Sequence, residues 1–334
     1  MRRPIALLLL PVLALVALGC GSVKNVTTPS ATQRVRLVLD YTPNPDHAGI
    51  YAAIHDGDFR RAGLDVQPIV PSDPAAPLKL LASGRADVVV SYEPEVMLAR
   101  DRGLDAVAIG ALVQTPLTSI MSVGKHGLRS VDQLDGTKIG TAGIPYQSAY
   151  LKTIAQQAGL DSSKIHEVNV GFNLVPAMLS HRVDATLGAF WNIEGVQLAR
   201  AHKDPRIIRI EKAGVPTYNE LVLVARGAAL RKNGELYRTF LQALARGQKA
   251  VVRDPRVGVD ALLTADKELE RGDTEAQVKA TVPTFFPADH SKPFGYMNPN
   301  EWAAYARWME SHKLLTRPAS PRALTNEFLP GEGL

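Results

Sequence analysis

Aromatic, amide and carboxylate side chains recur at the ends of the strands that the sequence of this 334-residue chain predicts. Aromatic faces stack on flat rings, and carboxylates accept hydrogen bonds from amino groups. This combination is typical of a cleft that binds a small planar heterocycle. The candidate ligand contacts are Tyr41, Asn44, His47, Tyr92, Glu93, Tyr146, Gln147, Trp191, Glu194, Tyr218 and Glu220.

Most of these candidates fall into three groups by the contact that each would make. Tyr146 and Gln147 open a predicted helix and would lie at the entrance of the cleft. The predicted stacking rings are Tyr41, Tyr92 and Trp191. The predicted polar contacts are Asn44, Glu93, Glu194 and Glu220. Taken singly, each residue fits a cap or a turn as well, so the prediction depends on their convergence in one cleft.

Signatures of catalysis and of metal binding are missing from the sequence. It contains no G-x-S-x-G elbow, no Walker A loop and no H-E-x-x-H motif. None of its eight histidines pairs with another at ligand spacing. Gly140 and Gly143 precede a predicted helix, but the third glycine and the acidic residue of a dinucleotide site are absent. The sequence therefore predicts no catalytic residue, no metal and no cofactor.

Strands and helices alternate along the first part of the chain. Apolar runs predict buried strands at residues 35–39, 64–70, 86–91 and 106–113. Helices are predicted at residues 46–62, 75–83 and 93–102. Asp46 would cap the first helix and Gly63 would end it. This alternation implies a parallel sheet with right-handed crossovers.

The same plan returns further along the chain. Strands are predicted at residues 138–141 and 166–170, with a helix at 147–158 between them. A helix, a tight turn and Arg-x-Asp before a buried strand then occur for the second time. The matching residues are Ser83, Arg85 and Asp87 in the first copy and Ser180, Arg182 and Asp184 in the second. The repetition predicts two similarly built α/β lobes.

The order of predicted elements in the last third of the chain indicates how these lobes are joined. A strand at 221–225 is followed by predicted helices at 235–253, 257–264, 274–282 and 299–312. Helices without new strands must pack onto an existing sheet, so we expect a two-stranded hinge near 118–123 and 221–225. Lobe 1 is predicted to hold residues 34–120 and 225–330, and lobe 2 residues 121–224. A cleft between two such lobes is a common ligand site that closes by hinge motion.

The N-terminus has the order of a secretory signal. Basic residues are followed by an apolar run at 6–18 and then by Gly19 and Cys20, the only cysteine of the chain. This order predicts a lipoprotein signal peptide at residues 1–20 with lipid attached to Cys20, although an ordinary signal with an incidental cysteine is the alternative. Residues 21–33 are polar and predict a flexible tether. The expected location is therefore extracytoplasmic, with the protein anchored to the cell membrane through lipid.

The charge balance argues against nucleic acid as a partner. The formal net charge is +5, and removal of Arg2 and Arg3 with the signal lowers it to +3. Such a small excess does not provide the basic surface that nucleic-acid binding requires. Hydrophobic residues make up 46% of the chain, which is ample for a large core. We expect a monomer.

Five segments of the sequence resemble thiamin-pyrimidine-binding proteins of ABC importers. They are Leu39–Tyr51, Ala62–Val66, Ser91–Glu93, Phe190–Gly195 and Thr325–Leu329. The resemblance implies the type II periplasmic-binding-protein fold and an ABC permease and ATPase as partners. It also implies a pyrimidine ligand of the formylaminopyrimidine or hydroxymethylpyrimidine type. Wider relatives bind sulfonates, nitrate or riboflavin, so the fold alone does not identify the solute.

The same superfamily contains an enzyme, hydroxymethylpyrimidine phosphate synthase. The enzyme uses a lysine for pyridoxal phosphate, a histidine that is consumed, and a cysteine-rich segment. In this chain the resemblance places Ser91 and Glu95 at the lysine and histidine positions, and residues 217–220 at the cysteines. These departures favour a non-catalytic binding protein. A binding protein for a sulfonate or another anion is a further alternative, and it would require arginine or lysine in the cleft.

Overall fold

The computed structural model describes residues 32–331. The predicted signal peptide, Cys20 and residues 21–31 of the predicted tether lie outside the described residues. Gln33, predicted as the end of the tether, is already the first residue of a strand. Within residues 32–331 no helix has the length and apolar character needed to cross a bilayer.

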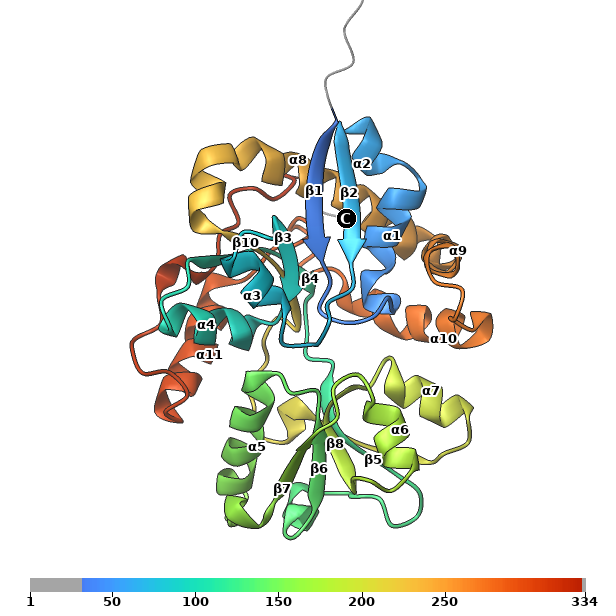
Figure 1. The fold of residues 1–334 in the computed structure, drawn as a ribbon, viewed down its shortest axis with the longest axis vertical. Helices are drawn as coiled ribbons and strands as arrows, with labels where there is room; N and C mark the ends of the chain where they lie inside the picture. Colours follow the sequence, from blue (N-terminus) through green and yellow to red (C-terminus); the bar gives the residue numbers. More distant parts are fainter. Residues whose placement is uncertain (1–31, 332–334) are drawn as a thin grey trace, which may run out of the picture. The chain divides into compact units, whose positions relative to one another are not determined.

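The first of two five-stranded sheets has the order β2-β1-β3-β10-β4 (Figure 1). Its strands are β1 (Gln33–Val38), β2 (Leu64–Ile69), β3 (Val88–Ser91), β4 (Ala106–Val113) and β10 (Leu221–Arg226). β1 runs parallel to β2 and β3, whereas β10 lies antiparallel between β3 and β4. The predicted strands are present, but the sheet is mixed rather than purely parallel, because the returning strand enters it from the opposite direction.

The second sheet repeats this plan in the order β7-β6-β8-β5-β9. Its strands are β5 (Thr118–Val123), β6 (Lys138–Thr141), β7 (His166–Asn169), β8 (Ala185–Phe190) and β9 (Pro205–Arg209). β6 is parallel to β7 and β8, and β5 is antiparallel to both β8 and β9. Each sheet therefore contains a parallel unit joined to an antiparallel strand. This symmetry agrees with the repetition that the sequence predicts.

Helices cover both sheets, and Figure 1 shows α5 on one side of the second sheet with α6 and α7 on the other. Those on the first sheet are α1 (Ala48–His55), α2 (Asp58–Arg61), α3 (Pro77–Ala82), α4 (Glu93–Asp101), α8 (Gly227–Arg253), α9 (Pro255–Ala265), α10 (Arg271–Thr281) and α11 (Pro299–Ser311). Those on the second sheet are α5 (Pro145–Gln157), α6 (Leu174–Leu179) and α7 (Glu194–Arg200). Asp254, Glu270 and Asn298 cap α9, α10 and α11 by accepting backbone N–H groups.

The single helix predicted at 46–62 is divided into three short elements. A 3₁₀ turn, η1 (Pro45–His47), precedes α1, and Gly57 separates α1 from α2. Gly57 has a φ of 78°, a left-handed conformation that a helix interior does not contain. Asn44, rather than Asp46, caps the first turn, because its side chain accepts the N–H of Asp46. This cap leaves the Asp46 carboxyl free for another contact.

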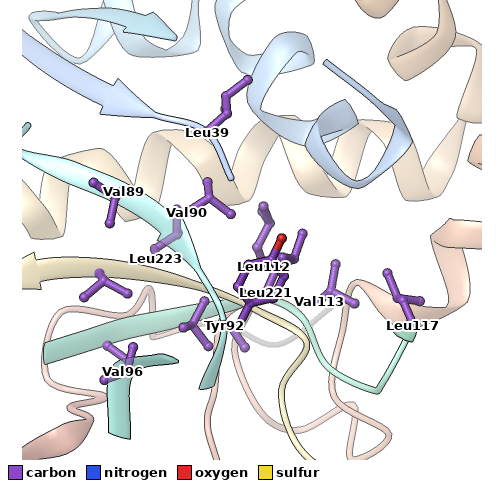
Figure 2. Close-up of a cluster of buried hydrophobic side chains, with 14 of the residues drawn as sticks. Leu39, Val89, Val90, Tyr92, Val96, Leu112, Val113, Leu117, Leu221 and Leu223 are labelled. Atoms are coloured by element: carbon purple, nitrogen blue, oxygen red, sulfur yellow. The ribbon is translucent and has the colours of Figure 1, made fainter. Parts of the chain in front are cut away.

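The core of the first sheet lies where β3, β4 and β10 meet (Figure 2). All residues of β3 and β4 are buried, which explains their continuous apolar sequences. Figure 2 shows side chains of β3, β4 and β10, including Val90, Leu112 and Leu223, gathered in one cluster. Tyr92, directly after β3, lies in the same cluster and is 4% exposed.

The chain changes sheet just before β5 and again before β10. Residues 114–117 connect β4 of the first sheet to β5 of the second, and residues 210–220 lead from β9 back to β10. The predicted boundaries at 120 and 224 fall inside β5 and β10, and each of these strands pairs within one sheet only. The two connecting segments therefore lie slightly earlier in the chain than the hydrophobic pattern suggests.

Glu220 joins these two connecting segments. Its carboxylate accepts the N–H groups of Leu117 (2.6 Å) and Thr118 (2.8 Å) as well as the Thr118 hydroxyl (2.8 Å). The Tyr218 hydroxyl donates to the same carboxylate at 3.1 Å. Burial raises the pKa of Glu220 to about 7, while these donors oppose the rise. Glu220 is thus a structural link between the sheets, and its predicted contact with ligand stays a prediction.

Replacing Glu220 by alanine is expected to destabilise the fold strongly. Two backbone N–H groups and two hydroxyls lose their shared acceptor, so the free energy of unfolding should fall by about 3 kcal/mol. Chemical denaturation followed by circular dichroism measures this change. Glu235→Ala is the matched control, since the Glu235 side chain is 80% exposed. Equal denaturation midpoints for the two variants would contradict the structural role of Glu220.

Candidate functional site

A cavity of about 400 Å³ lies between residues that belong to the two sheets. The loop after β1 and the start of α4 contribute Asp40, Tyr41, Asn44 and Tyr92. The second sheet and its loops contribute Ala142, Gln147, Phe172, Gly188, Phe190 and Glu194. A cavity of this size, lined by aromatic rings and a few polar groups, is typical of a small-molecule site.

Asp40 is the most strongly held polar group in the cavity wall. It is 1% exposed and accepts the Tyr92 hydroxyl at 2.8 Å. On its other oxygen it is hydrogen-bonded to His47 Nε2, also at 2.8 Å. Burial and the nearby Asp40 charge raise the pKa of Tyr92 well above its ordinary value, so Tyr92 remains a neutral donor. His47 itself lies outside the cavity and orients the Asp40 carboxylate from behind.

Tyr41 and Phe172 close the cavity from opposite sides. Tyr41 follows β1, and Phe172 lies between β7 and α6 of the second sheet. Their ring centroids are 4.6 Å apart with an interplanar angle of 81°, an edge-to-face contact. Asn44 lies beside Tyr41 in the wall, where its amide nitrogen donates to the carbonyl of Thr42 at 3.1 Å. This bond and the cap on η1 give the loop one defined conformation.

Gln147 is positioned in the wall by a glycine of the neighbouring strand. Its Oε1 accepts the N–H of Ala142 at 2.8 Å. Gly188 in β8 has a φ of 117°, and a Cβ there would come within 2.3 Å of Gln147 Nε2. Only glycine therefore lets the Gln147 amide lie against β8.

Glu194 supplies a second carboxyl group to the cavity. It opens α7, and its Oε2 accepts the N–H of Phe190 at 2.7 Å. The side chain is partly exposed toward the cavity, although the surrounding protein screens it from bulk solvent. Burial raises the pKa of Glu194 to about 7, opposed by the hydrogen bond from Phe190. Its protonation can therefore change near neutral pH.

The charge of the cavity wall has one sign. Five carboxylates line it: Asp40, Glu194, Glu268, Glu270 and Asp273. The last three stand at the rim on α10 and the loop before it, where Arg200 pairs with Asp273. Among the described residues that line the cavity there is no lysine, arginine or histidine. Such a wall favours a ligand that donates hydrogen bonds or carries positive charge, and disfavours an anion.

Trp191 does not line the cavity, contrary to its predicted stacking role. Its indole N–H donates to the carbonyl of Pro116 at 3.1 Å, and the Arg209 guanidinium lies 4.0 Å from its ring centroid. Phe190, one residue earlier, does line the cavity. Successive side chains at a strand end point to opposite faces, so only one of the two neighbours can face the ligand.

Five further candidates are buried outside the cavity wall. Glu93 accepts the N–H of Asn219 at 2.7 Å, and Tyr146 packs behind Tyr92 with a ring distance of 5.2 Å. The predicted site residues outside the wall are His47, Glu93, Tyr146, Trp191, Tyr218 and Glu220. Those in the wall are Tyr41, Asn44, Tyr92, Gln147 and Glu194. Tyr218 and Glu220 belong to the link between the sheets.

Sequence reasoning missed several wall residues. Asp40 directly precedes Tyr41 and has the strand-end signal that selected its neighbour. Gly188 carries a weaker signal, since glycine inside a strand marks a close approach. Phe172 and the rim residues Thr274 and Gln277 carry no recognisable signal. Within residues 32–331 no group of three or more metal-binding side chains is arranged to hold an ion.

Comparison with known proteins links this architecture to one family. The family model described as NMT1/THI5 like matches residues 44–257. A formylaminopyrimidine-binding protein of Halalkalibacterium halodurans is 30% identical over 308 residues, which cover 92% of this chain and 93% of that protein. A 4-amino-5-hydroxymethyl-2-methylpyrimidine phosphate synthase of Saccharomyces cerevisiae is 24% identical over 236 residues, 67% of this chain and 69% of the enzyme.

Solved structures confirm the predicted fold. The alkanesulfonate-binding protein SsuA from Xanthomonas axonopodis pv. citri, bound to MOPS, superposes with a TM-score of 0.68 at 17% sequence identity. The match covers 89% of this chain and 99% of that protein. The two mixed sheets thus form the type II periplasmic-binding-protein fold. From the family match and the relative that aligns along nearly its whole length, the chain belongs to the NMT1/THI5-like family.

Proposed function

We propose that this protein is the extracytoplasmic solute-binding component of an ABC importer and captures a thiamin pyrimidine precursor in the cavity. The observation that carries the proposal is the composition of the wall, which combines carboxylates, an amide and aromatic rings. An aminopyrimidine is flat and offers amino hydrogens to carboxylates and ring nitrogens to donors. The formylaminopyrimidine-binding relative supports this solute class over the alternatives.

An anionic solute fits the cavity poorly. Sulfonate and nitrate groups require N–H donors and cationic side chains to replace their hydration. Asp40 and Glu194 instead present acceptors inside the cavity, and the rim adds three more carboxylates. The resemblance to an alkanesulfonate-binding protein therefore concerns the fold and not the solute. The proposed ligand contacts are Asp40, Tyr41, Asn44, Tyr92, Gln147, Phe172, Phe190 and Glu194.

A binding role fits the cavity better than the synthase reaction of the yeast relative. Pyridoxal phosphate forms an imine with a lysine amine, and the cavity wall contains no lysine among its described residues. Ser91, which the resemblance places at that lysine, is a buried residue of β3. Glu95, at the histidine position, accepts the N–H of Tyr146 at 3.1 Å. We propose that the protein is not an enzyme.

Delivery of the solute follows from the N-terminal sequence and the two-sheet fold. The proposed lipid on Cys20 would hold a monomer at the outer face of the cell membrane, near the permease and ATPase. We propose two lobes, residues 34–120 with 225–330 and residues 121–224, each containing one sheet. The links at 114–117 and 210–220 would act as the hinge about which they open and close.

The solute class is tested by calorimetry of the purified protein with three compounds. Formylaminopyrimidine and hydroxymethylpyrimidine are expected to bind at least ~100-fold more tightly than an alkanesulfonate, a difference of about 2.7 kcal/mol. The physical reason is that the wall supplies acceptors and no cationic side chain. Tighter binding of the sulfonate would refute the proposal.

Tyr41 and Trp191 form a matched pair of aromatic substitutions. Tyr41→Ala removes a ring of the cavity wall and should weaken pyrimidine binding by roughly 1–3 kcal/mol. Trp191→Ala removes a larger ring outside the wall and should change the affinity by less than about 0.5 kcal/mol. Isothermal titration with formylaminopyrimidine measures both. The reverse order of effects would show that the ligand binds beside Trp191.

Glu194 should make pyrimidine binding depend on pH. Because burial raises its pKa to about 7, Glu194 is neutral below that pH and ionised above it. Only the carboxylate accepts from an amino group with both oxygens, so affinity for a neutral aminopyrimidine should rise as pH increases through about 7. Glu194→Gln should flatten this rise between about pH 6 and 8. An equally steep rise in the variant would assign the titration to another group.

A further inference from the structure

Two buried side chains meet between the sheets, away from the cavity wall. Asp46 lies in η1 beside the first sheet, and Asn192 lies between β8 and α7 of the second. Both are 0% exposed, and Asn192 Nδ2 donates to Asp46 Oδ1 at 2.8 Å. The same nitrogen donates to the Thr281 hydroxyl at 2.7 Å. The Thr281 hydroxyl donates its hydrogen bond to the carbonyl of Gln277, so toward Asn192 the hydroxyl oxygen must act as an acceptor. The nitrogen of the Asn192 amide therefore faces Thr281, which determines the orientation of the amide.

Each member of this pair has one polar atom without a partner. Asp46 Oδ2 and Asn192 Oδ1 are buried and accept no hydrogen bond within the described structure. Both are acceptors, and a buried acceptor without a donor is energetically unfavourable. Neither residue lines the cavity, so a bound solute does not reach either atom. A hydrogen on Asp46 Oδ2 would convert one of these two acceptors into a donor.

The surroundings of Asp46 favour such a hydrogen. Burial raises the pKa of Asp46 well above its ordinary value, and the charges of Asp40, Glu194 and Glu220 add to the rise. The hydrogen bond from Asn192 acts in the opposite direction. The neighbouring imidazole of His47 is directed at Asp40 through Nε2.

The helices packed against η1 bring no charge to this site. The buried face of α10 consists of Thr274, Gln277, Val278 and Thr281. The buried face of α9 consists of Gly258, Val259, Ala261 and Leu262. The buried face of α1 is equally uncharged and begins with Ala48, Gly49 and Ile50. The charged groups that raise the pKa of Asp46 are therefore the carboxyls of Asp40, Glu194 and Glu220.

We propose that Asp46 and Asn192 form a proton-dependent latch between the two halves of the protein. In the closed arrangement Asp46 carries a proton on Oδ2 and donates it to Asn192 Oδ1, while Asn192 Nδ2 donates to Asp46 Oδ1. A carboxylic acid and a carboxamide then make two reciprocal hydrogen bonds. When the halves separate, water reaches Asp46, the proton passes to solvent and the carboxylate is hydrated. Closure thus takes up one proton from solvent at a site distinct from the solute contacts.

The sign of the pH dependence follows from this cycle. Asp46 has a higher pKa in the closed form than in the open, hydrated form, so the latch is complete at low pH. The stabilisation of the closed form by the latch is lost as pH rises through the closed-state pKa. The equilibrium constant for closing then falls by up to about tenfold per pH unit. Acting through Asp46, lower pH therefore favours capture and higher pH favours release. Glu194 acts with the opposite sign, so the two groups must be separated by variants.

Asp46→Asn is the decisive variant, because asparagine makes the same reciprocal pair with Asn192 without a proton. With formylaminopyrimidine as the probe, calorimetry in buffers of different ionisation enthalpy counts the protons taken up per molecule bound. The variant should take up fewer protons than the native protein, by at most one per molecule bound, and still bind the probe. Asn192→Ala removes the hydrogen-bond partner of residue 46, so it should weaken binding both in the native protein and in Asp46→Asn. Equal proton counts in the native protein and Asp46→Asn would overturn the latch, as would equal loss of binding in Asp46→Asn and Asn192→Ala.

A measurement without solute separates failure of the latch from failure of the proposed function on which its transport role rests. Infrared spectroscopy with isotope-labelled aspartate reports the carbonyl band of a protonated carboxylic acid. In the ligand-free native protein this band should grow as pH is lowered from neutral, because protonation of Asp46 favours the closed form, and Asp46→Asn should lack it. A spectrum with no protonated aspartate would refute the latch even if the pyrimidine binds. A band that persists in a protein with no pyrimidine affinity would refute only the solute.

Discussion

Buried carboxyl groups link the two sheets of this protein. Glu220 accepts two N–H groups of the segment that leads into β5, and Glu95 accepts the N–H of Tyr146 at the start of α5. Asp46 likewise accepts a hydrogen bond from the side-chain amide of Asn192. A carboxyl group taken out of water must find donors, and here the donors belong to the opposite half of the fold. The relative placement of the halves therefore depends on a few polar contacts in an apolar interior.

This constraint also determines the character of the cavity. The wall itself carries five carboxyl groups, so it offers hydrogen-bond acceptors before any ligand arrives. Asp40 is held by Tyr92 and His47, and Glu194 by Phe190, which fixes the position of both carboxyls. Aromatic rings from both halves complete the wall. A flat molecule with amino groups can satisfy both the rings and the carboxyls of such a site.

Much of the fold could be predicted because local patterns specify it. Apolar runs located β4 at 106–113 correctly, and the helices predicted at 257–264, 274–282 and 299–312 match α9, α10 and α11 within a few residues. The antiparallel insertion of β5 and β10 could not be predicted, since each pairs with strands that are far away in the sequence and such pairing leaves no local signal. The prediction of one helix at 46–62 was wrong at Gly57, because its left-handed conformation interrupts the helix although the apolar residues around it have helical spacing. The edge strand β9 was missed because its exposed, charged sequence resembles a loop.

The site was predicted in part for a related reason. Strand ends converge in this topology, which correctly brought Tyr41, Tyr92 and Glu194 to one cavity. Residue type alone does not reveal which side of a strand end a side chain faces, and Trp191 points away where Phe190 points in. Nor does it distinguish a carboxylate that meets a ligand from one that joins two halves of the fold, as Glu220 does. Contact with a ligand and linkage of the two halves both require a buried carboxyl group that accepts hydrogen bonds.

A crystal structure of the protein with formylaminopyrimidine bound is the most direct test of binding in this cavity. The pyrimidine ring is expected in the cavity between the sheets, against Tyr41 or Phe172, with its amino group within hydrogen-bond distance of Asp40 or Glu194. Density for the ring outside this cavity, or a ring whose amino group contacts neither carboxyl, would contradict it.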